Sequence, residues 1–109
     1  MGKRIRVQRR GRGTPTFRAS SHKRVAPARY PPMCKEEKEG VIQGQISGIF
    51  HEAGRGSPLA SVRLETGEMF YTVVPEGVYE GQHAQIGSMA SVDIGNVLPL
   101  GSVPEGTMV

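Results

Sequence analysis

Residues 41–51 have the sequence VIQGQISGIFH, the best strand pattern in the chain. Apolar side chains recur at Ile42, Ile46 and Phe50, so they share one face of an extended strand. Gly44 and Gly48 fall between them, and glycines at such positions often mark the bends of a small, strongly curved barrel. The stretch therefore predicts a curved strand of a small β-barrel.

Two further strands are predicted directly after this one. Residues 59–64 alternate in period two, with apolar side chains on one face and Ser61 and Arg63 on the other. Residues 69–74, MFYTVV, are rich in residues that favour strands. Turn-forming residues at 52–57 and 66–67 separate these segments.

The C-terminal part is expected to add shorter strands. Residues 78–87 are polar and predict one irregular turn, whereas residues 90–94 predict a short strand. Residues 97–100 and 103–109 are further strand candidates, broken by prolines. Short strands, turn signals roughly every eight to twelve residues and no convincing helix predict an all-β fold. An oligonucleotide-binding (OB) barrel is the first choice, and an SH3-type barrel is the second.

A basic, turn-rich segment precedes the predicted barrel. Residues 1–35 contain eleven Lys and Arg and no acid (+11), residues 36–109 contain three against ten acids (−7), and the two sum to +4. Residues 11–22, GRGTPTFRASSH, are too rich in Gly, Pro, Ser and Thr for a helix or a core strand. Residues 35–40, KEEKEG, predict one helical turn ended by Gly40. We therefore expect an extended basic N-terminal arm, residues 1–35, and an OB-fold barrel domain, residues 36–109.

Nucleic-acid binding is the function that this composition favours. Arginine pairs with phosphate through two parallel hydrogen bonds and stacks on exposed bases. RNA is favoured over DNA because an irregular arm suits the crevices of folded RNA, and no segment resembles a recognition helix. Phe17 is expected either to stack on a base or to staple the arm onto the barrel. Arg55 lies in what is expected to be a plain hairpin loop, with a phosphate contact as the alternative.

Other functions lack the residues that they need. The single cysteine, Cys34, predicts a reduced thiol in a cytosolic protein. His22, His51 and His83 share no metal-ligand spacing, so neither a metal nor another cofactor is expected. No nucleophile has a recognisable base partner, so we predict no enzyme and no small-molecule substrate. No apolar run approaches the roughly 18 residues of a membrane span, so no membrane partner is expected.

Four runs of residues together resemble one family. They are GRGTPTFRASSH (11–22), HEAGRGSPLA (51–60), PEGVYEGQ (75–82) and IGNVLPLGSVPEGT (94–107). In this order and spacing they resemble the universal second protein of the large ribosomal subunit, in its archaeal and eukaryotic form. The resemblance implies an arm and an OB-type barrel bound to large-subunit ribosomal RNA, beside neighbouring ribosomal proteins, in cytoplasmic ribosomes. It also implies a part in subunit association, in tRNA binding and in organising the peptidyl-transferase region.

The resemblance supplies the candidate RNA-binding residues. Those in the matching motifs are Arg4, Arg6, Arg9, Arg10, Arg12, Thr14, Phe17, Arg18, His22, Lys23 and Arg24, together with Arg55 in the barrel loop. Lys3 and Arg29, which belong to the same basic arm, complete the set.

Two features depart from the family pattern. The family continues past residue 109 into a second, SH3-like barrel with a histidine-containing segment near the catalytic centre. We therefore expect a partial chain and assign it no direct part in peptide transfer. Residues 68–74, EMFYTVV, replace basic residues of many relatives, which weakens any RNA contact there. The alternative function is a stand-alone OB-fold module for single-stranded nucleic acid or protein interaction, which would need several aromatic side chains on one barrel face.

Overall fold

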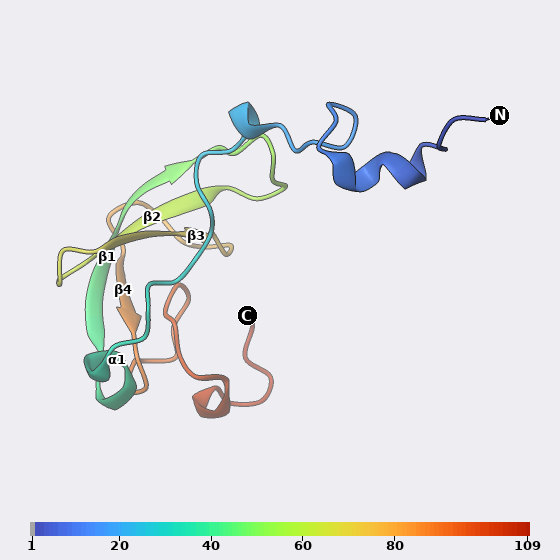
Figure 1. The fold of residues 1–109 in the computed structure, drawn as a ribbon. Helices are drawn as coiled ribbons and strands as arrows, with labels where there is room; N and C mark the ends of the chain where they lie inside the picture. Colours follow the sequence, from blue (N-terminus) through green and yellow to red (C-terminus); the bar gives the residue numbers. More distant parts are fainter. Residues whose placement is uncertain (1) are drawn as a thin grey trace.

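The computed structural model describes residues 2–109, which form a curved antiparallel sheet and a long N-terminal segment (Figure 1). The strands are β1 (Ile42–Phe50), β2 (Leu59–Leu64), β3 (Met69–Val73) and β4 (His83–Ile86), in the order β3-β2-β1-β4. The helices are α1 (Lys35–Glu39) and three short 3-10 helices, η1 (Val7–Arg12), η2 (Ser21–Lys23) and η3 (Leu100–Ser102). The all-β prediction is confirmed, and the sheet is consistent with a small OB-type domain.

Strand β1 pairs with two neighbours along different parts of its length. Its first four residues pair antiparallel with β4, and residues from Gly44 onward pair antiparallel with β2. At Gly44, where the two pairings overlap, a Cβ atom would lie 3.1 Å from Leu64 Cδ2 and 3.2 Å from the Arg63 carbonyl oxygen. The glycine therefore permits a close approach of β1 to β2.

A β-bulge bends β1 near the second predicted glycine. Ile46 lies opposite Val62 but Gly48 lies opposite Ser61, so Ser47 is the extra residue. The irregularity falls next to Gly48, where the glycine pattern predicted a bend. Phe50 was predicted to share one face with Ile42 and Ile46, but those two side chains are buried whereas Phe50 is 42% exposed. The bulge turns the end of the strand, so Ile49 packs against the core in its place.

The bulge also explains a polar side chain inside the sheet domain. Ser61, predicted on the face of β2 opposite the apolar side chains, is buried. Its hydroxyl lies 2.7 Å from the hydroxyl of Ser47, so the bulged residue supplies the hydrogen-bond partner that a buried hydroxyl needs. Arg63, predicted on the same side, is exposed as expected.

The hydrophobic core takes side chains from all four strands of the sheet. It is formed by Ile42, Ile46, Ala60, Val62, Leu64, Phe70 and Ile86. Residues from outside the sheet pack against it at its edges, among them Cys34 before α1 and Val97 after β4. Buried apolar side chains thus come from every strand of the sheet.

The fourth strand lies where an irregular turn was expected. Residues 83–86 pair with β1, whereas the strands predicted at 90–94 and 103–109 are not formed in residues 2–109. Of residues 97–100, only Val97 pairs, in an isolated parallel bridge with Ile86. The prediction was wrong because β4 shows only Ala84 and Ile86 as apolar alternation, and its pairing partner lies about 40 residues earlier in the chain.

Helix α1 is the predicted single turn, and it ends at Gly40. The Gly40 amide donates to the Glu36 carbonyl oxygen at 2.8 Å. The backbone amide of Glu36 and the Cys34 side chain hold the pKa of the Glu36 carboxyl below its ordinary value, because both stabilise the carboxylate. The amides of Ser88 and Met89 donate to carbonyls of Glu37 and Gly40, which fixes α1 against the end of β4.

The N-terminal segment runs away from the sheet and gives the molecule dimensions of 64 × 28 × 28 Å (Figure 1). Its backbone contains two short 3-10 helices, η1 and η2, and a hydrogen-bonded turn at residues 14–18, and it is otherwise irregular. Hydrogen bonds between this segment and the sheet domain begin at Lys23 and continue at Val25 and Arg29. Tyr30 then packs against Phe70 of β3, with the ring centroids 5.9 Å apart.

Candidate nucleic-acid interface

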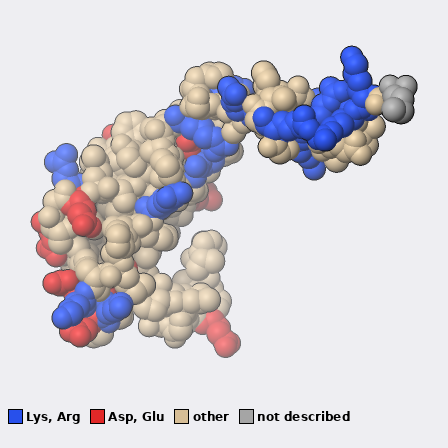
Figure 2. Space-filling model, viewed as in Figure 1, with Lys and Arg blue, Asp and Glu red and all other residues tan. Residues whose placement is uncertain are grey.

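Basic side chains gather on the N-terminal segment, and acidic side chains lie over the sheet domain (Figure 2). Figure 2 shows patches of Lys and Arg atoms along the part that projects from the sheet. Since no acid occurs before Glu36, no carboxylate of this segment neutralises these cations. The segment therefore presents a concentrated positive charge to an anionic partner.

The first half of this segment folds back on itself through local hydrogen bonds. Gly13 ends η1 with a φ of 68°, a left-handed conformation that glycine adopts without strain. The amides of Phe17 and Arg18 then both donate to the Thr14 carbonyl oxygen at 3.0 Å. The guanidinium of Arg18 donates to the Gly13 carbonyl oxygen at 3.1 Å, which holds the turn beside the end of η1.

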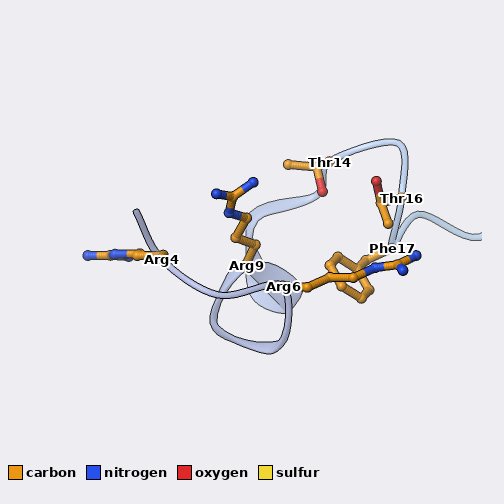
Figure 3. A pocket seen from close by; sticks show the side chains of 6 residues that line it. All are labelled: Arg4, Arg6, Arg9, Thr14, Thr16 and Phe17. Carbon is orange, nitrogen blue, oxygen red and sulfur yellow. The ribbon is translucent and has the colours of Figure 1, made fainter. Parts of the chain in front are cut away.

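This turn and η1 enclose a basic hollow of about 430 Å³. It is lined by Arg4, Arg6, Arg9, Thr14, Thr16 and Phe17. Figure 3 shows the Arg9 guanidinium directed toward Thr14, and Arg6 extending beside the ring of Phe17. The Arg6 guanidinium carbon lies 6.0 Å from the ring centroid, within the range of a cation–π contact.

The hollow combines the groups that recognise a nucleotide. Three guanidinium groups supply charged donors for phosphate oxygens, and two threonine hydroxyls can donate or accept. Phe17 is half-buried beside Arg6, so it packs within the basic segment and not on the sheet. Phe17 therefore does not staple the arm onto the barrel, which was one of its two expected roles. Its ring lies beside the hollow.

A second hollow, of about 460 Å³, lies where the basic segment meets the sheet domain. It is lined by Arg24, Val25, Ala26, Pro27, Ala28 and Arg55. Arg24 and Arg55 thus line the same hollow, although about 30 residues separate them in the sequence.

Arg55 has an acidic partner that the sequence analysis missed. Its Nε lies 2.7 Å from Oε2 of Glu52, a carboxylate that is 1% exposed. The Nε–H bond is poorly aligned with that oxygen, so the contact is an ion pair more than a directed hydrogen bond. The spacing of three residues between Glu52 and Arg55 was the available signal. The charge of Arg55 is therefore partly offset by Glu52 within the protein.

The remaining candidates lie along the segment without joining either hollow. They are Lys3, Arg10, Arg12, Arg18, His22, Lys23 and Arg29, all of which are exposed. The backbone of Arg29 is fixed, since its amide donates to the Tyr71 carbonyl oxygen at 3.0 Å. These side chains extend the basic surface on both sides of the second 3-10 turn, η2.

Residues 2–109 offer neither a metal site nor a membrane-spanning helix. No group of three or more His, Cys, Asp or Glu side chains among them could hold a metal ion. Within the same residues, no helix has both the length and the apolar character needed to cross a bilayer.

Comparison with known proteins gives one consistent result. The sequence model of the family described as "Ribosomal Proteins L2, RNA binding N-terminal domain" matches residues 1–85. Proteins named "Large ribosomal subunit protein uL2" align with the whole chain, at 52% identity in Korarchaeum cryptofilum and 48% in Thermofilum pendens. The same name belongs to a protein of Methanocaldococcus jannaschii that is 47% identical over 109 residues.

The chain is shorter than these relatives. It covers 43% of the Korarchaeum cryptofilum protein, 44% of the Thermofilum pendens protein and 45% of the Methanocaldococcus jannaschii protein. It thus spans less than half the length of the curated relatives that it matches.

Proposed function

The chain belongs to the ribosomal protein L2 family, and from that premise we propose that it is a structural constituent of the large ribosomal subunit that binds ribosomal RNA. The site of action is the ribosome in the cytoplasm, where the chain lies beside other ribosomal proteins. Through its RNA contacts it supports subunit association, tRNA binding and the organisation of the peptidyl-transferase region. It contributes structure and charge, not catalysis.

One observation carries the proposal: the basic hollow holds three arginines, two threonines and an aromatic ring, with no acid in the segment. Folded RNA brings phosphates close together, and their repulsion must be neutralised where helices pack. A segment with +11 over its first 35 residues supplies that neutralisation. Its irregular backbone fits a crevice of folded RNA better than the regular groove of duplex DNA. Structured RNA is therefore favoured as the partner.

The proposed RNA-binding residues fall into two groups. Arg4, Arg6, Arg9, Thr14 and Phe17 form the basic hollow, where Phe17 is proposed to stack on a base. Lys3, Arg10, Arg12, Arg18, His22, Lys23, Arg24, Arg29 and Arg55 are proposed to contact phosphates along the flanking surface. Arg55 is the weakest of these, because Glu52 offsets its charge.

The test is filter binding of the full chain to large-subunit ribosomal RNA, comparing Arg9→Glu with Arg63→Glu. Both substitutions change the net charge equally, but Arg9 lines the basic hollow and Arg63 is exposed on β2. A lost charge-assisted contact is worth about 1.5–3 kcal/mol, so Arg9→Glu should weaken binding by about 10- to 100-fold. Arg63→Glu should change binding by less than about threefold, because no base or phosphate is proposed near it.

Two outcomes would contradict the proposal. Equal losses in the two variants would mean diffuse attraction without a defined site. Equal affinity for large-subunit RNA, small-subunit RNA and poly(U) would instead support a general single-strand-binding module. The structure does not favour that module, because Phe70 is buried in the core and Phe50 and Tyr79 are the exposed aromatic side chains of the sheet domain.

A further inference from the structure

Glu52 is the one charged side chain of residues 2–109 that is buried in the sheet domain, at 1% exposure. Burying a carboxylate is costly unless hydrogen bonds and an opposite charge compensate it. One of its oxygens, Oε1, accepts a hydrogen bond from the Val25 amide at 3.0 Å, across 27 residues of sequence. The other, Oε2, lies 2.7 Å from Arg55 Nε. The carboxylate therefore joins the N-terminal segment to the loop after β1.

The same loop makes a second contact with the same stretch of backbone. The Gly54 amide donates to the Lys23 carbonyl oxygen at 2.9 Å. Gly54 also lies so close that a Cβ atom there would be 3.2 Å from Arg24 Cγ and 3.3 Å from the Lys23 oxygen. Residues 52–55, which we term the clamp loop, thus hold residues 23–25 by two hydrogen bonds and by direct packing.

The contact between the clamp loop and residues 23–25 lies at the point where the N-terminal segment leaves the sheet. Before Lys23, the projecting segment makes its hydrogen bonds within itself, and after Val25 the next anchor on the sheet is Arg29. The direction in which the segment leaves the sheet is therefore set at the clamp loop. A segment held in its bound direction loses less conformational freedom when it meets a partner, which raises affinity.

We infer that Glu52 is a positioning residue. It fixes residues 23–25, where the basic segment joins the sheet domain, so that the basic hollow is held in one orientation for binding RNA. The inference rests on the proposed RNA-binding function, and it gives Glu52 a role although this carboxylate cannot itself attract phosphate. Arg55 acts with it, because its Nε compensates the buried charge while its side chain also lines the second hollow beside Arg24.

The first measurement is the arm's orientation in the free protein, independent of RNA. Spin labels are placed at Ser20→Cys, beyond the clamp loop, and Glu68→Cys, in the exposed β2–β3 turn, in a Cys34→Ala background. The distance distribution between the labels should be narrow in the otherwise unchanged chain. It should broaden in Glu52→Ala, which removes both contacts of the carboxylate. Glu52→Gln keeps an oxygen that can accept from the Val25 amide, so it should restore most of the narrow distribution.

A second variant guards against general destabilisation by Glu52→Ala. Gly54→Ala keeps both contacts of the Glu52 carboxylate, but its new Cβ atom would press against Arg24 and Lys23. This variant should therefore also broaden the distance distribution. Gly56→Ala is the matched control: no atom lies within 4 Å of the position that its Cβ would take, so the distribution should stay narrow. Amide exchange in β1 and β2 should be unchanged in all of these variants, which shows that the sheet remains folded.

The second measurement is filter binding of the same variants, without labels, to large-subunit ribosomal RNA. Glu52→Ala and Gly54→Ala should each bind about 5- to 20-fold more weakly, and Glu52→Gln and Gly56→Ala within about twofold of the unchanged chain. An unchanged distance distribution in both weakened variants would overturn the inference, as would Glu52→Gln behaving like Glu52→Ala. Broadened distances with unaltered RNA affinity would overturn its functional part. Another outcome is that the unchanged chain fails to bind this RNA while the spin-label distances still broaden in Glu52→Ala. That result would overturn the proposed function and leave the positioning role of Glu52 standing.

Discussion

Gly87 shows how strongly one residue can be constrained by an element far from it in sequence. Its φ is 145°, a conformation that side-chain-bearing residues rarely adopt. A Cβ atom there would also meet the carbonyl oxygen of Gly40, and would lie 3.0 Å from the Val41 Cα. Both neighbours are backbone atoms at the end of α1, so they cannot rotate away. The glycine is therefore required where α1 packs on the end of β4.

We expect Gly87→Ala to destabilise the domain by about 2–6 kcal/mol, because strained backbone and overpacking each cost about 1–3 kcal/mol. Chemical denaturation followed by circular dichroism measures this loss. Gly101→Ala is the matched control, since its Cβ meets nothing within 4 Å, and it should change stability by less than about 0.5 kcal/mol. A small effect at Gly87 would show that α1 can move off β4 at little cost.

At the scale of elements, β1 organises the sheet because it pairs with β2 and β4 and carries the bulge. The bulge explains why two phenylalanines that both lie in predicted strands differ in how far they are buried. Phe70, on the regular strand β3, is 6% exposed, whereas Phe50, after the bulge, is 42% exposed. The geometry of the strand, and not the residue type, decides which ring enters the core.

Phe70→Ala should therefore cost about 3–5 kcal/mol, the usual range for removing a buried ring. Phe50→Ala should cost about 1 kcal/mol or less, because much of its ring already contacts water. Thermal unfolding of the two variants under the same conditions gives the comparison. Equal losses would mean that β1 is regular in solution and that Phe50 occupies the core.

At the scale of the whole molecule, charge and folding are divided between different parts of the chain. Residues 2–20 carry seven Lys and Arg and lie beyond the clamp loop. Residues 23–33 are also basic, yet they pack on the sheet through Val25, Arg29 and Tyr30. We therefore propose that the folding unit begins near residue 23, earlier than the boundary at residue 36 that the charge switch favours.

Deleting residues 1–20 should leave the unfolding temperature unchanged, and deleting residues 1–33 should lower it. The longer deletion removes three hydrogen bonds, at Lys23, Val25 and Arg29, worth about 1 kcal/mol each, and an aromatic contact worth about 1 kcal/mol. A loss of about 4 kcal/mol lowers the midpoint by more than about 15 °C in a domain of this size. Scanning calorimetry of both deletions decides the boundary. Equal midpoints in the two deletions would place it at residue 36.

The shorter deletion should also reduce the salt dependence of RNA binding. Each phosphate contact contributes about 0.7–0.9 to the slope of log affinity against log salt concentration, so removing seven cations should lower the slope by up to about 5 or 6. Filter binding at a series of KCl concentrations measures the slope. An unaltered slope would show that the sheet domain, not the projecting segment, contacts the phosphates.

Features that depend only on neighbouring residues could be predicted from the amino-acid sequence. Period-two alternation at 42–46 and 59–64 is enough to predict β1 and β2, and Gly40 is enough to end α1. The absence of acids before Glu36 was sufficient to predict a nucleic-acid partner, because net charge needs no fold to be counted. Motifs along the chain pointed to the family without any knowledge of the sheet.

Features that depend on residues distant in sequence could not be predicted and became evident only in the folded chain. Strand β4 has a weak pattern and forms because β1 offers it a free edge. Phe50 leaves the core because a bulge alters the register against β2. Glu52 resembles any loop carboxylate until the fold brings the Val25 amide within 3.0 Å of it. In each case the deciding contact is long-range, and a long-range contact is fixed by packing of the whole chain and not by local propensity.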